Sequence, residues 1–190
     1  MKALFAHYPN VFDAALCDEI ITLGGKLDTC KAEVGEHGRY EDSRRADIAW
    51  AHPTNKEWLW VRNHIQMLMI KANAEFFDVD CRWLPALQFT TYDEAVKGCF
   101  DKHLDNFFHK ALGAYDRKLS AVLQLSDPDS YEGGYLALDL PNEDVGPAPE
   151  IMRQRGSVIV FPSFVYHEVS PVTKGRRHSL VAWMEGPQWR

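Results

Sequence analysis

The feature that most constrains the fold is a series of short apolar segments after residue 80, separated by turn residues and not by helices. The segments are rich in Leu, Val, Tyr and Phe, which is typical of β-strands. Between them, DPDSYEGG (127–134) and SPVTKG (170–175) are dense in the residues that turns require. The segments are LPALQFTTY (84–92), KLSAVLQLS (118–126), GYLALDL (134–140), SVIVFP (157–162) and SLVAWME (179–185). Such a pattern predicts an all-β sandwich or a closed jelly roll.

Before residue 80 the apolar residues recur at helical intervals. The first segment offers Asp13 as an N-cap and Gly24-Gly25 as a stop. In the second, Thr54 and Glu57 form a capping-box pattern. Its apolar stripe, spaced by three or four residues, consists of Trp58, Val61, Ile65, Leu68, Ala72 and Phe76. We expect two helices that pack outside the jelly roll.

The polar, glycine-bearing segment 33–50 lies between these helices and predicts a long loop that ends in a short strand. We interpret residues 35–50 as a lid over an active site. The length of 190 residues is typical of one domain. We therefore expect a single domain over 1–190, with helical support and the lid in 1–80 and the jelly-roll core in 80–185.

Composition excludes several classes of function. The net charge of -6 and the lack of a basic stripe argue against nucleic acid as a partner. No apolar run approaches the ~20 residues that a membrane span needs. Four scattered cysteines without a C-x-x-C pair indicate free thiols in a reducing compartment. The start of the chain lacks the pattern of a signal peptide, so we expect a cytoplasmic protein.

One polar stretch, FDKHLDNFFHK (100–110), contains the pair His103-x-Asp105. Residues i and i+2 of a strand point to the same face, so both side chains can reach one metal ion. A non-haem Fe(II) oxygenase needs two neutral imidazoles and one carboxylate on one side of the ion, with the other positions open. A bare His-x-Asp pair is too common to decide, so a third ligand must come from a distant strand.

The segment FPSFVYHEVSPVTKGRRHSLVAW (161–183) supplies His167, just after an apolar run. Arg177 stands ten residues later, on the strand that follows the predicted turn. A buried guanidinium at that place can grip a carboxylate held next to the metal.

The ordered set HLD … GSVIVFPSFVYHEVSPVTKGRRHSLVAW resembles the iron- and 2-oxoglutarate-dependent dioxygenases, in particular their prolyl-4-hydroxylase-type branch. The resemblance covers roughly residues 80–185 and implies a distorted double-stranded β-helix, in agreement with the strand-and-turn pattern. It implies that His103, Asp105 and His167 ligate Fe(II), and that Arg177 holds the distal carboxylate of 2-oxoglutarate.

The same resemblance suggests roles for further residues. Tyr92 and Ser179 are expected to donate to the cosubstrate carboxylate, and Gln124 stands where some relatives have a tyrosine near the cosubstrate. Substrate contacts are suggested for residues that surface charge or core packing explains about as well, namely Trp183, Arg117, Trp50, Arg44 and Arg45. No catalytic residue is expected beyond the metal ligands.

By resemblance, the reaction consumes O2 and 2-oxoglutarate, hydroxylates an unactivated C–H bond and is supported by ascorbate as a reductant. The leading expectation for the substrate is a prolyl residue of a peptide or protein; a free amino acid or small metabolite is the alternative. From other classes, a non-catalytic metal-binding jelly-roll module and a cupin-like metalloenzyme without 2-oxoglutarate stay open. A monomer or weak dimer is the default expectation.

Overall fold

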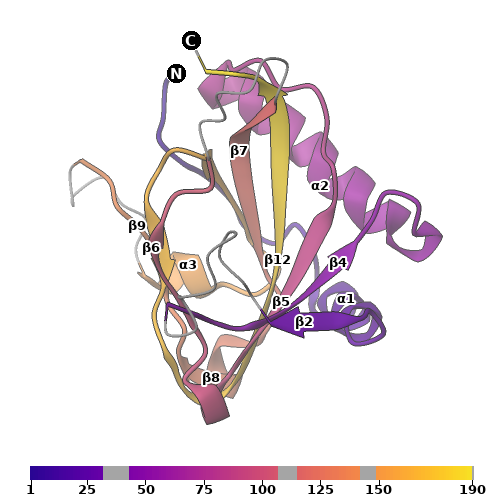
Figure 1. Ribbon diagram of the computed structural model, residues 1–190, viewed down its shortest axis with the longest axis vertical. Helices are drawn as coiled ribbons and strands as arrows, with labels where there is room; N and C mark the ends of the chain where they lie inside the picture. The colour runs from indigo at the N-terminus through magenta and orange to yellow at the C-terminus, as the bar shows by residue number, and fades with distance from the viewer. Residues whose placement is uncertain (32–42, 107–114, 142–148, 190) are drawn as a thin grey trace.

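The computed structural model describes residues 1–31, 43–106, 115–141 and 149–189, which form mainly two antiparallel β-sheets that face each other (Figure 1). The larger sheet contains, in order, β1 (Ala6–Tyr8), β10 (Val158–Pro162), β7 (Tyr115–Gln124), β12 (Val172–Pro187), β5 (Leu87–Asp93), β4 (Asp47–Ala51) and β2 (Thr29–Lys31), with β8 (Tyr131–Gly133) paired to β12. The smaller sheet contains β3 (Arg44–Arg45), β6 (Cys99–His103), β11 (His167–Val169) and β9 (Leu136–Leu138). The predicted jelly roll is confirmed.

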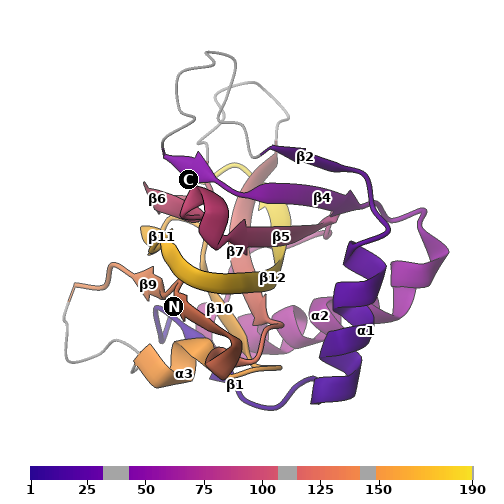
Figure 2. The same ribbon diagram turned by 90° about the horizontal axis from the view of Figure 1, so that it is seen from below.

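Two long helices cover the larger sheet on the side away from the smaller sheet (Figure 2). Helix α1 (Ala14–Gly24) begins as predicted, because the Asp13 carboxylate accepts a hydrogen bond from Leu16 N at 2.9 Å. The helix ends at Gly25. The N-terminal helices therefore lie outside the jelly roll, as expected. No helix in the described ranges has the length and apolar character needed to cross a membrane.

The start of the second helix differs from the prediction. Asn55, not Thr54, supplies the cap, since its side chain accepts from Glu57 N at 3.2 Å. A 3₁₀ turn (Lys56–Trp58) then leads into α2 (Leu59–Ala72).

The buried stripe of the second helix is also shifted at two positions. Met69 and Phe77 are fully buried, whereas the predicted Leu68 and Phe76 are only partly buried. Met69 follows Ile65 by four residues, and a π-helical turn (Asn73–Phe77) adds one residue after Ala72. The wider turn returns Phe77 to the core one position later than regular α-helical spacing predicts.

The five predicted strands are present, but SPVTKG is not the predicted turn. β12 already begins at Val172, because its first residues pair with β8. The segment 33–50 also contains more strand than expected, namely β3 and β4. Residues 32–42, which include half of the predicted lid, lie outside the described residues.

Short turns and one short helix complete the described chain. The 3₁₀ turns lie at Glu94–Val96 and Pro128–Ser130, and helix α3 spans Pro149–Arg153.

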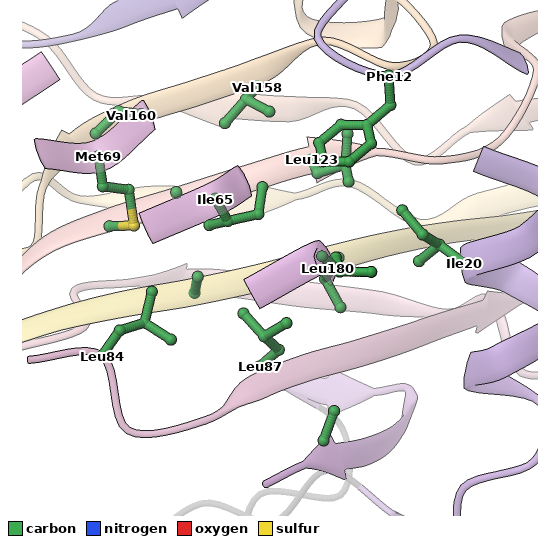
Figure 3. Packing of buried hydrophobic residues seen from close by; sticks show 14 of the residues in the cluster. Phe12, Ile20, Ile65, Met69, Leu84, Leu87, Leu123, Val158, Val160 and Leu180 are labelled. Atoms are coloured by element: carbon green, nitrogen blue, oxygen red, sulfur yellow. The ribbon is translucent and has the colours of Figure 1, made fainter. Parts of the chain in front are cut away.

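The side chains of β12 point alternately to the two sides of the larger sheet, and a separate layer of buried residues lies on each side. Leu180, Ala182 and Met184 point toward the helices, where they join the larger apolar cluster. Figure 3 shows Ile65 and Met69 of α2 in the same apolar cluster as Leu180 of β12. The odd-numbered residues of β12 from Arg177 to Trp183 lie on the opposite side, toward the smaller sheet. Several of the residues on this inner face are polar and buried, among them Gln88, Thr90, Ser120, Gln124, Arg177 and Ser179. An apolar core does not require them, so this face is where a functional site is expected.

Gly156 is a fold-critical position. It adopts φ +73°, and its carbonyl accepts hydrogen bonds from Val11 N at 2.9 Å and Phe12 N at 3.1 Å. A Cβ atom here would overlap the Phe12 carbonyl. We expect Gly156→Ala to lower the free energy of unfolding by at least about 2 kcal/mol, measured by chemical denaturation. Gly25→Ala is the matched control, because φ is -66° and a Cβ meets nothing closer than 3.6 Å. Equal stability of the two variants would contradict this account.

Candidate functional site

A cluster of two histidines and one aspartate lies between the two sheets. The candidate ligand atoms of His103, Asp105 and His167 all lie within 4.8 Å of one another. His103 Nε2 is 3.7 Å from Asp105 Oδ1, and His167 Nε2 is 3.5 Å from Asp105 Oδ2. The two histidines are brought together because β6 and β11 pair with His103 directly opposite His167. The structure thus unites three residues that lie up to 64 positions apart in the sequence.

Asp105 reaches the cluster by a route that the sequence pattern did not predict. β6 ends at His103, so the two residues do not share a strand face. The chain bends after the strand, and the backbone N–H groups of Asp105 and Asn106 both donate to the Ser163 carbonyl, at 3.0 and 3.1 Å. These bonds turn the carboxylate back toward the histidines.

Surrounding groups fix the orientation of each side chain in the cluster. His103 Nδ1 lies 2.7 Å from the Asp101 carbonyl, and His167 Nδ1 lies 3.1 Å from the Val165 carbonyl. A carbonyl only accepts, so we assign the proton of each ring to Nδ1, which leaves Nε2 with a free lone pair. Both histidines therefore present Nε2 toward Asp105, in the tautomer that binds a metal.

Ser120 holds the carboxylate of the cluster. Its hydroxyl donates to Asp105 Oδ2 at 2.7 Å and lies 3.0 Å from the hydroxyl of Ser163. Sequence reasoning missed this residue. The available signal was a serine in the middle of an apolar strand, a position that needs a buried hydrogen-bond partner.

The surroundings of the cluster lower the pKa values of His103 and Asp105, so both can offer lone pairs to a cation. Burial, together with His167, lowers the pKa of His103 to about 4, although Asp105 acts in the opposite direction. Burial alone would raise the pKa of Asp105, but His167, His103, Arg117 and the Ser120 hydroxyl together lower it. At neutral pH the cluster therefore holds a carboxylate and an uncharged His103. Two imidazoles and one carboxylate are the donor set of a non-haem Fe(II) site.

Arg177, on β12, belongs to a second buried polar group with Tyr92, Gln124 and Ser179, which we call the chamber. One guanidinium nitrogen, Nη2, donates to Gln124 Oε1 at 2.9 Å, and the group lies over the Tyr92 ring with 4.9 Å to the ring centroid. Ser179 pairs with Gln124 in register, and Arg177 pairs with Tyr92. The three residues predicted to hold the cosubstrate carboxylate are thus brought together with Gln124, which was expected near the cosubstrate. Burial raises the pKa of the Tyr92 phenol, although Arg177 and Ser179 act in the opposite direction.

Several donors in this chamber have no acceptor among the described residues. They are Nε and Nη1 of Arg177 and Nε2 of Gln124, all fully buried. A buried donor without a partner costs on the order of 1–3 kcal/mol. The chamber therefore fits an anion with several acceptor atoms, as a carboxylate has.

The residues suggested for substrate contacts divide into two groups. Trp183 and Trp50 lie together, with 5.9 Å between ring centroids, and the Arg117 guanidinium lies 3.9 Å from the Trp183 ring centroid. Arg44 lies over the Phe100 ring at 5.3 Å, on the inner side of the smaller sheet. Arg45 faces the other way and donates through Nε to the Lys97 carbonyl at 3.2 Å.

Comparison with known proteins identifies relatives for part of the chain. Residues 87–185 match a family model described as the 2OG-Fe(II) oxygenase superfamily. A PKHD-type hydroxylase of Pseudomonas putida is 34% identical over 91 residues, which are 46% of this chain and 38% of that protein. A PKHD-type hydroxylase of Acinetobacter baumannii is 37% identical over 100 residues, or 51% of this chain and 41% of that protein. The matches span about two fifths of these curated relatives.

Solved structures resemble the whole described fold. A prolyl-4-hydroxylase of Pseudomonas putida aligns with a TM-score of 0.68 at 22% identity, covering 98% of this chain and 93% of the other. A prolyl hydroxylase of Trichoplax adhaerens, in complex with a hypoxia inducible factor peptide fragment, aligns with a TM-score of 0.72 at 16% identity, covering 95% and 83%. At these identities the similarity shows the fold alone.

Proposed function

Since the chain belongs to the 2OG-Fe(II) oxygenase superfamily, we propose that it is an Fe(II)- and 2-oxoglutarate-dependent dioxygenase that hydroxylates an unactivated C–H bond. His103 and His167 hold the metal through Nε2, and Asp105 holds it through its carboxylate. When bound, Fe(II) and 2-oxoglutarate activate O2 and supply the oxidising chemistry, with succinate and CO2 as co-products. The protein holds the ligands in place and leaves the remaining metal positions open.

One observation carries this proposal: a donor set suited to Fe(II) and a buried group of donors that fits a carboxylate border the same space between the two sheets. Ser120, which holds Asp105, lies on β7 four residues before Gln124, which holds Arg177. Both side chains lie on the inner side of β7, so the metal ligands and the chamber border the same interior, and we propose that one small dicarboxylate extends from the metal toward the chamber. Arg177 Nε and Nη1 are buried donors that lack an acceptor among the described residues. A non-catalytic metal-binding module would not need such donors, and an enzyme that does not use 2-oxoglutarate would not need them either.

The chain's own residues orient the cosubstrate. Arg177 offers Nε and Nη1 to the distal carboxylate, while Gln124 keeps the guanidinium in place and offers its own amide N–H. Tyr92 and Ser179 complete the polar wall of the chamber. Because these groups are buried, water competes poorly for the same carboxylate.

For the substrate, we propose a prolyl residue of a peptide or protein, with a free amino acid or small metabolite as the alternative. Support comes from the prolyl hydroxylases with the same fold, one of which is described with a peptide bound. Trp183, Arg117, Trp50 and Arg44 line the proposed substrate side. Ascorbate as reductant, a cytoplasmic location, a monomeric or weakly dimeric state, one domain over 1–190 and a lid in 35–50 are further parts of the proposal.

The function is tested by incubating the Fe(II)-loaded protein with 2-oxoglutarate and proline-containing peptides or free amino acids. Succinate release coupled to a mass increase of one oxygen atom on the substrate is the expected result. Oxygen on a proline ring supports the prolyl assignment, and oxygen elsewhere overturns it. If the protein binds neither Fe(II) nor 2-oxoglutarate, that result would contradict the reaction class.

Ser120→Ala tests how the metal ligand is held. The variant keeps all three ligands but removes the donor to Asp105 Oδ2, so the carboxylate is free to rotate. Loss of such a supporting hydrogen bond should weaken Mn(II) binding by about tenfold, measured by calorimetry. Ser157→Ala is the control, since this buried serine bonds to the Gln154 carbonyl and not to the cluster. Unchanged affinity in Ser120→Ala would show that Ser120 is not needed to orient the ligand.

A further inference from the structure

The turn that joins β10 to β11, residues 162–165, contacts two of the three proposed metal ligands. The Ser163 carbonyl accepts the backbone N–H of Asp105 at 3.0 Å. The Val165 carbonyl lies 3.1 Å from His167 Nδ1. β10 belongs to the larger sheet and β11 to the smaller one, so this turn crosses from one sheet to the other. Its position therefore sets how Asp105 and His167 lie relative to each other.

Phe164 stands between the two residues whose carbonyl groups make these contacts. Its side chain packs against the apolar cluster between the sheets, and its ring lies edge-on to Trp189 with 5.3 Å between ring centroids. Because each peptide unit is planar, a rotation of the backbone at Phe164 would move both neighbouring carbonyl groups. The contact with Trp189 is therefore placed where it can hold both ligand contacts at once.

Trp189 follows β12 and is anchored to the first half of β7. Its backbone N–H donates to Asp116 Oδ2 at 3.0 Å, and its indole N–H donates to the Arg117 carbonyl at 3.4 Å. The Lys118 ammonium lies over the indole ring, 4.0 Å from the ring centroid. Asp116 and Lys118 are only 2% and 4% exposed, so Trp189 is held by buried side chains.

The same stretch of β7 also anchors the turn, because the Lys118 carbonyl accepts from Ser163 N at 3.0 Å. Trp189 and the turn are thus attached to one strand, and the contact between Trp189 and Phe164 joins them a second time. Edge-to-face aromatic pairs and cation–π contacts are both favourable beyond the area that they bury. An aromatic ring at residue 189 is therefore suited to hold the turn in one position.

We propose, on the basis of the proposed function, that Trp189 is a positioning residue of the metal site. Trp189 is not itself a ligand. It acts through Phe164 on residues 162–165, whose carbonyl groups set Asp105 and His167. Trp189 lies beyond the residues that match the family model, so that match does not single it out.

The test measures Mn(II) binding to the metal-free protein by calorimetry. Trp189→Ala should weaken binding by about tenfold, the effect typical of groups that orient metal ligands. Trp189→Phe keeps a ring against Phe164 and beneath Lys118, so its affinity should stay within about threefold of the wild type. Trp83→Ala is the matched control and should bind Mn(II) like the wild type, because Trp83 is 45% exposed and bridges Glu185 through its backbone.

A role in stability alone would give a different result. The free energy of unfolding of Trp189→Ala would then fall in chemical denaturation, while the folded variant would bind Mn(II) as the wild type does. The visible absorption of the Co(II)-loaded protein is a further readout, since its bands depend on the geometry of the ligands. We expect the bands to shift in Trp189→Ala and to return toward the wild-type positions in Trp189→Phe. Either an Mn(II) affinity within about twofold of the wild type or an unchanged Co(II) spectrum in Trp189→Ala would overturn the inference.

Phe164→Leu tests the route from Trp189 to the ligands, because it keeps apolar packing but removes the edge-to-face contact. Its Mn(II) affinity should fall by about threefold, and the double variant should bind no more weakly than Trp189→Ala alone. Additive losses would overturn the proposed route. If Trp189→Ala does not fold, Phe164→Leu decides, and an unchanged Mn(II) affinity in it overturns the inference.

His167→Ala separates this inference from the proposed function. If the wild type binds Mn(II) and His167→Ala does not, the cluster holds the metal, and unchanged binding in Trp189→Ala then contradicts this inference alone. If the wild type does not bind Mn(II), or if His167→Ala binds it equally well, the proposed metal site fails, and the inference that rests on it fails as well.

Discussion

Replacing Asp105 by alanine should reduce the turnover of 2-oxoglutarate by at least about a thousandfold while the protein stays folded, because the proposed metal site loses the carboxylate among its three ligands. The two imidazoles that remain are neutral donors, and His103 and His167 alone do not define three positions on one side of an ion. Succinate release, measured with saturating Fe(II) and 2-oxoglutarate, gives the effect on turnover.

Folding of the Asp105→Ala variant should be nearly unchanged. The substitution removes a buried charge, and Ser120 keeps Ser163 as a hydrogen-bond partner, so the free energy of unfolding of the metal-free protein should change by no more than about 1.5 kcal/mol. Glu168→Ala is the control, since this exposed carboxylate adjoins His167 on β11 and faces the other way. His103→Ala should behave like Asp105→Ala. Retained turnover in either ligand variant would show that the metal is held elsewhere.

Replacing Arg177 by glutamine should raise the KM for 2-oxoglutarate by about a hundredfold, which corresponds to the loss of a buried charge-assisted contact. The binding of Fe(II) should change much less, because Arg177 does not belong to the His103–Asp105–His167 cluster. Steady-state kinetics over 2-oxoglutarate concentration, together with metal titration, separate the two effects.

Two neighbouring substitutions sharpen the result for Arg177. Arg177→Lys keeps the charge but loses the planar fork that bonds Gln124 and leaves Nε and Nη1 for the ligand, so its KM should lie between those of the wild type and the glutamine variant. Arg176→Gln removes the adjacent arginine, which is exposed and pairs with Asp93 at 2.6 Å, and its KM should stay within about twofold. An unchanged KM in Arg177→Gln would mean that the carboxylate partner is a different residue.

Local patterns predicted the parts of this fold that depend on local physics. Asp13 capped α1 as expected, because an N-cap needs only its own first turn. The stripe of α2 was right at Val61 and Ile65 and shifted at Phe77, where a π-helical turn adds a residue. Nothing in the residue spacing distinguishes that turn from a regular one, since the packing of the helix against the sheet decides it.

The candidate site shows the same division. The sequence allowed His103, Asp105, His167 and Arg177 to be predicted as candidate site residues, because metal and carboxylate binding restrict such positions to a few residue types. The reason given for His103 and Asp105 was partly wrong, because Asp105 lies beyond the strand and is turned by Ser163. That contact joins segments 58 residues apart, so only the tertiary structure reveals it.

The separation of Arg44 from Arg45 illustrates what register adds. Two adjacent arginines look equivalent in a sequence, and both were considered as substrate contacts. Pairing of β3 with β6 places Arg44 opposite Phe100 and therefore on the inner face, while Arg45 lies opposite Cys99 and bonds the Lys97 carbonyl. A shift of one residue in this pairing would exchange their roles.

The central claim, that the space between the two sheets holds both Fe(II) and 2-oxoglutarate, is tested most directly by an anaerobic titration of the metal-free protein with Fe(II) and 2-oxoglutarate. The readout is the weak visible metal-to-ligand charge-transfer band of the chelate, recorded for the wild type and for His167→Ala. We expect the band in the wild type and its loss in the variant. Absence of the band in a folded wild-type protein that has bound Fe(II) would contradict the claim.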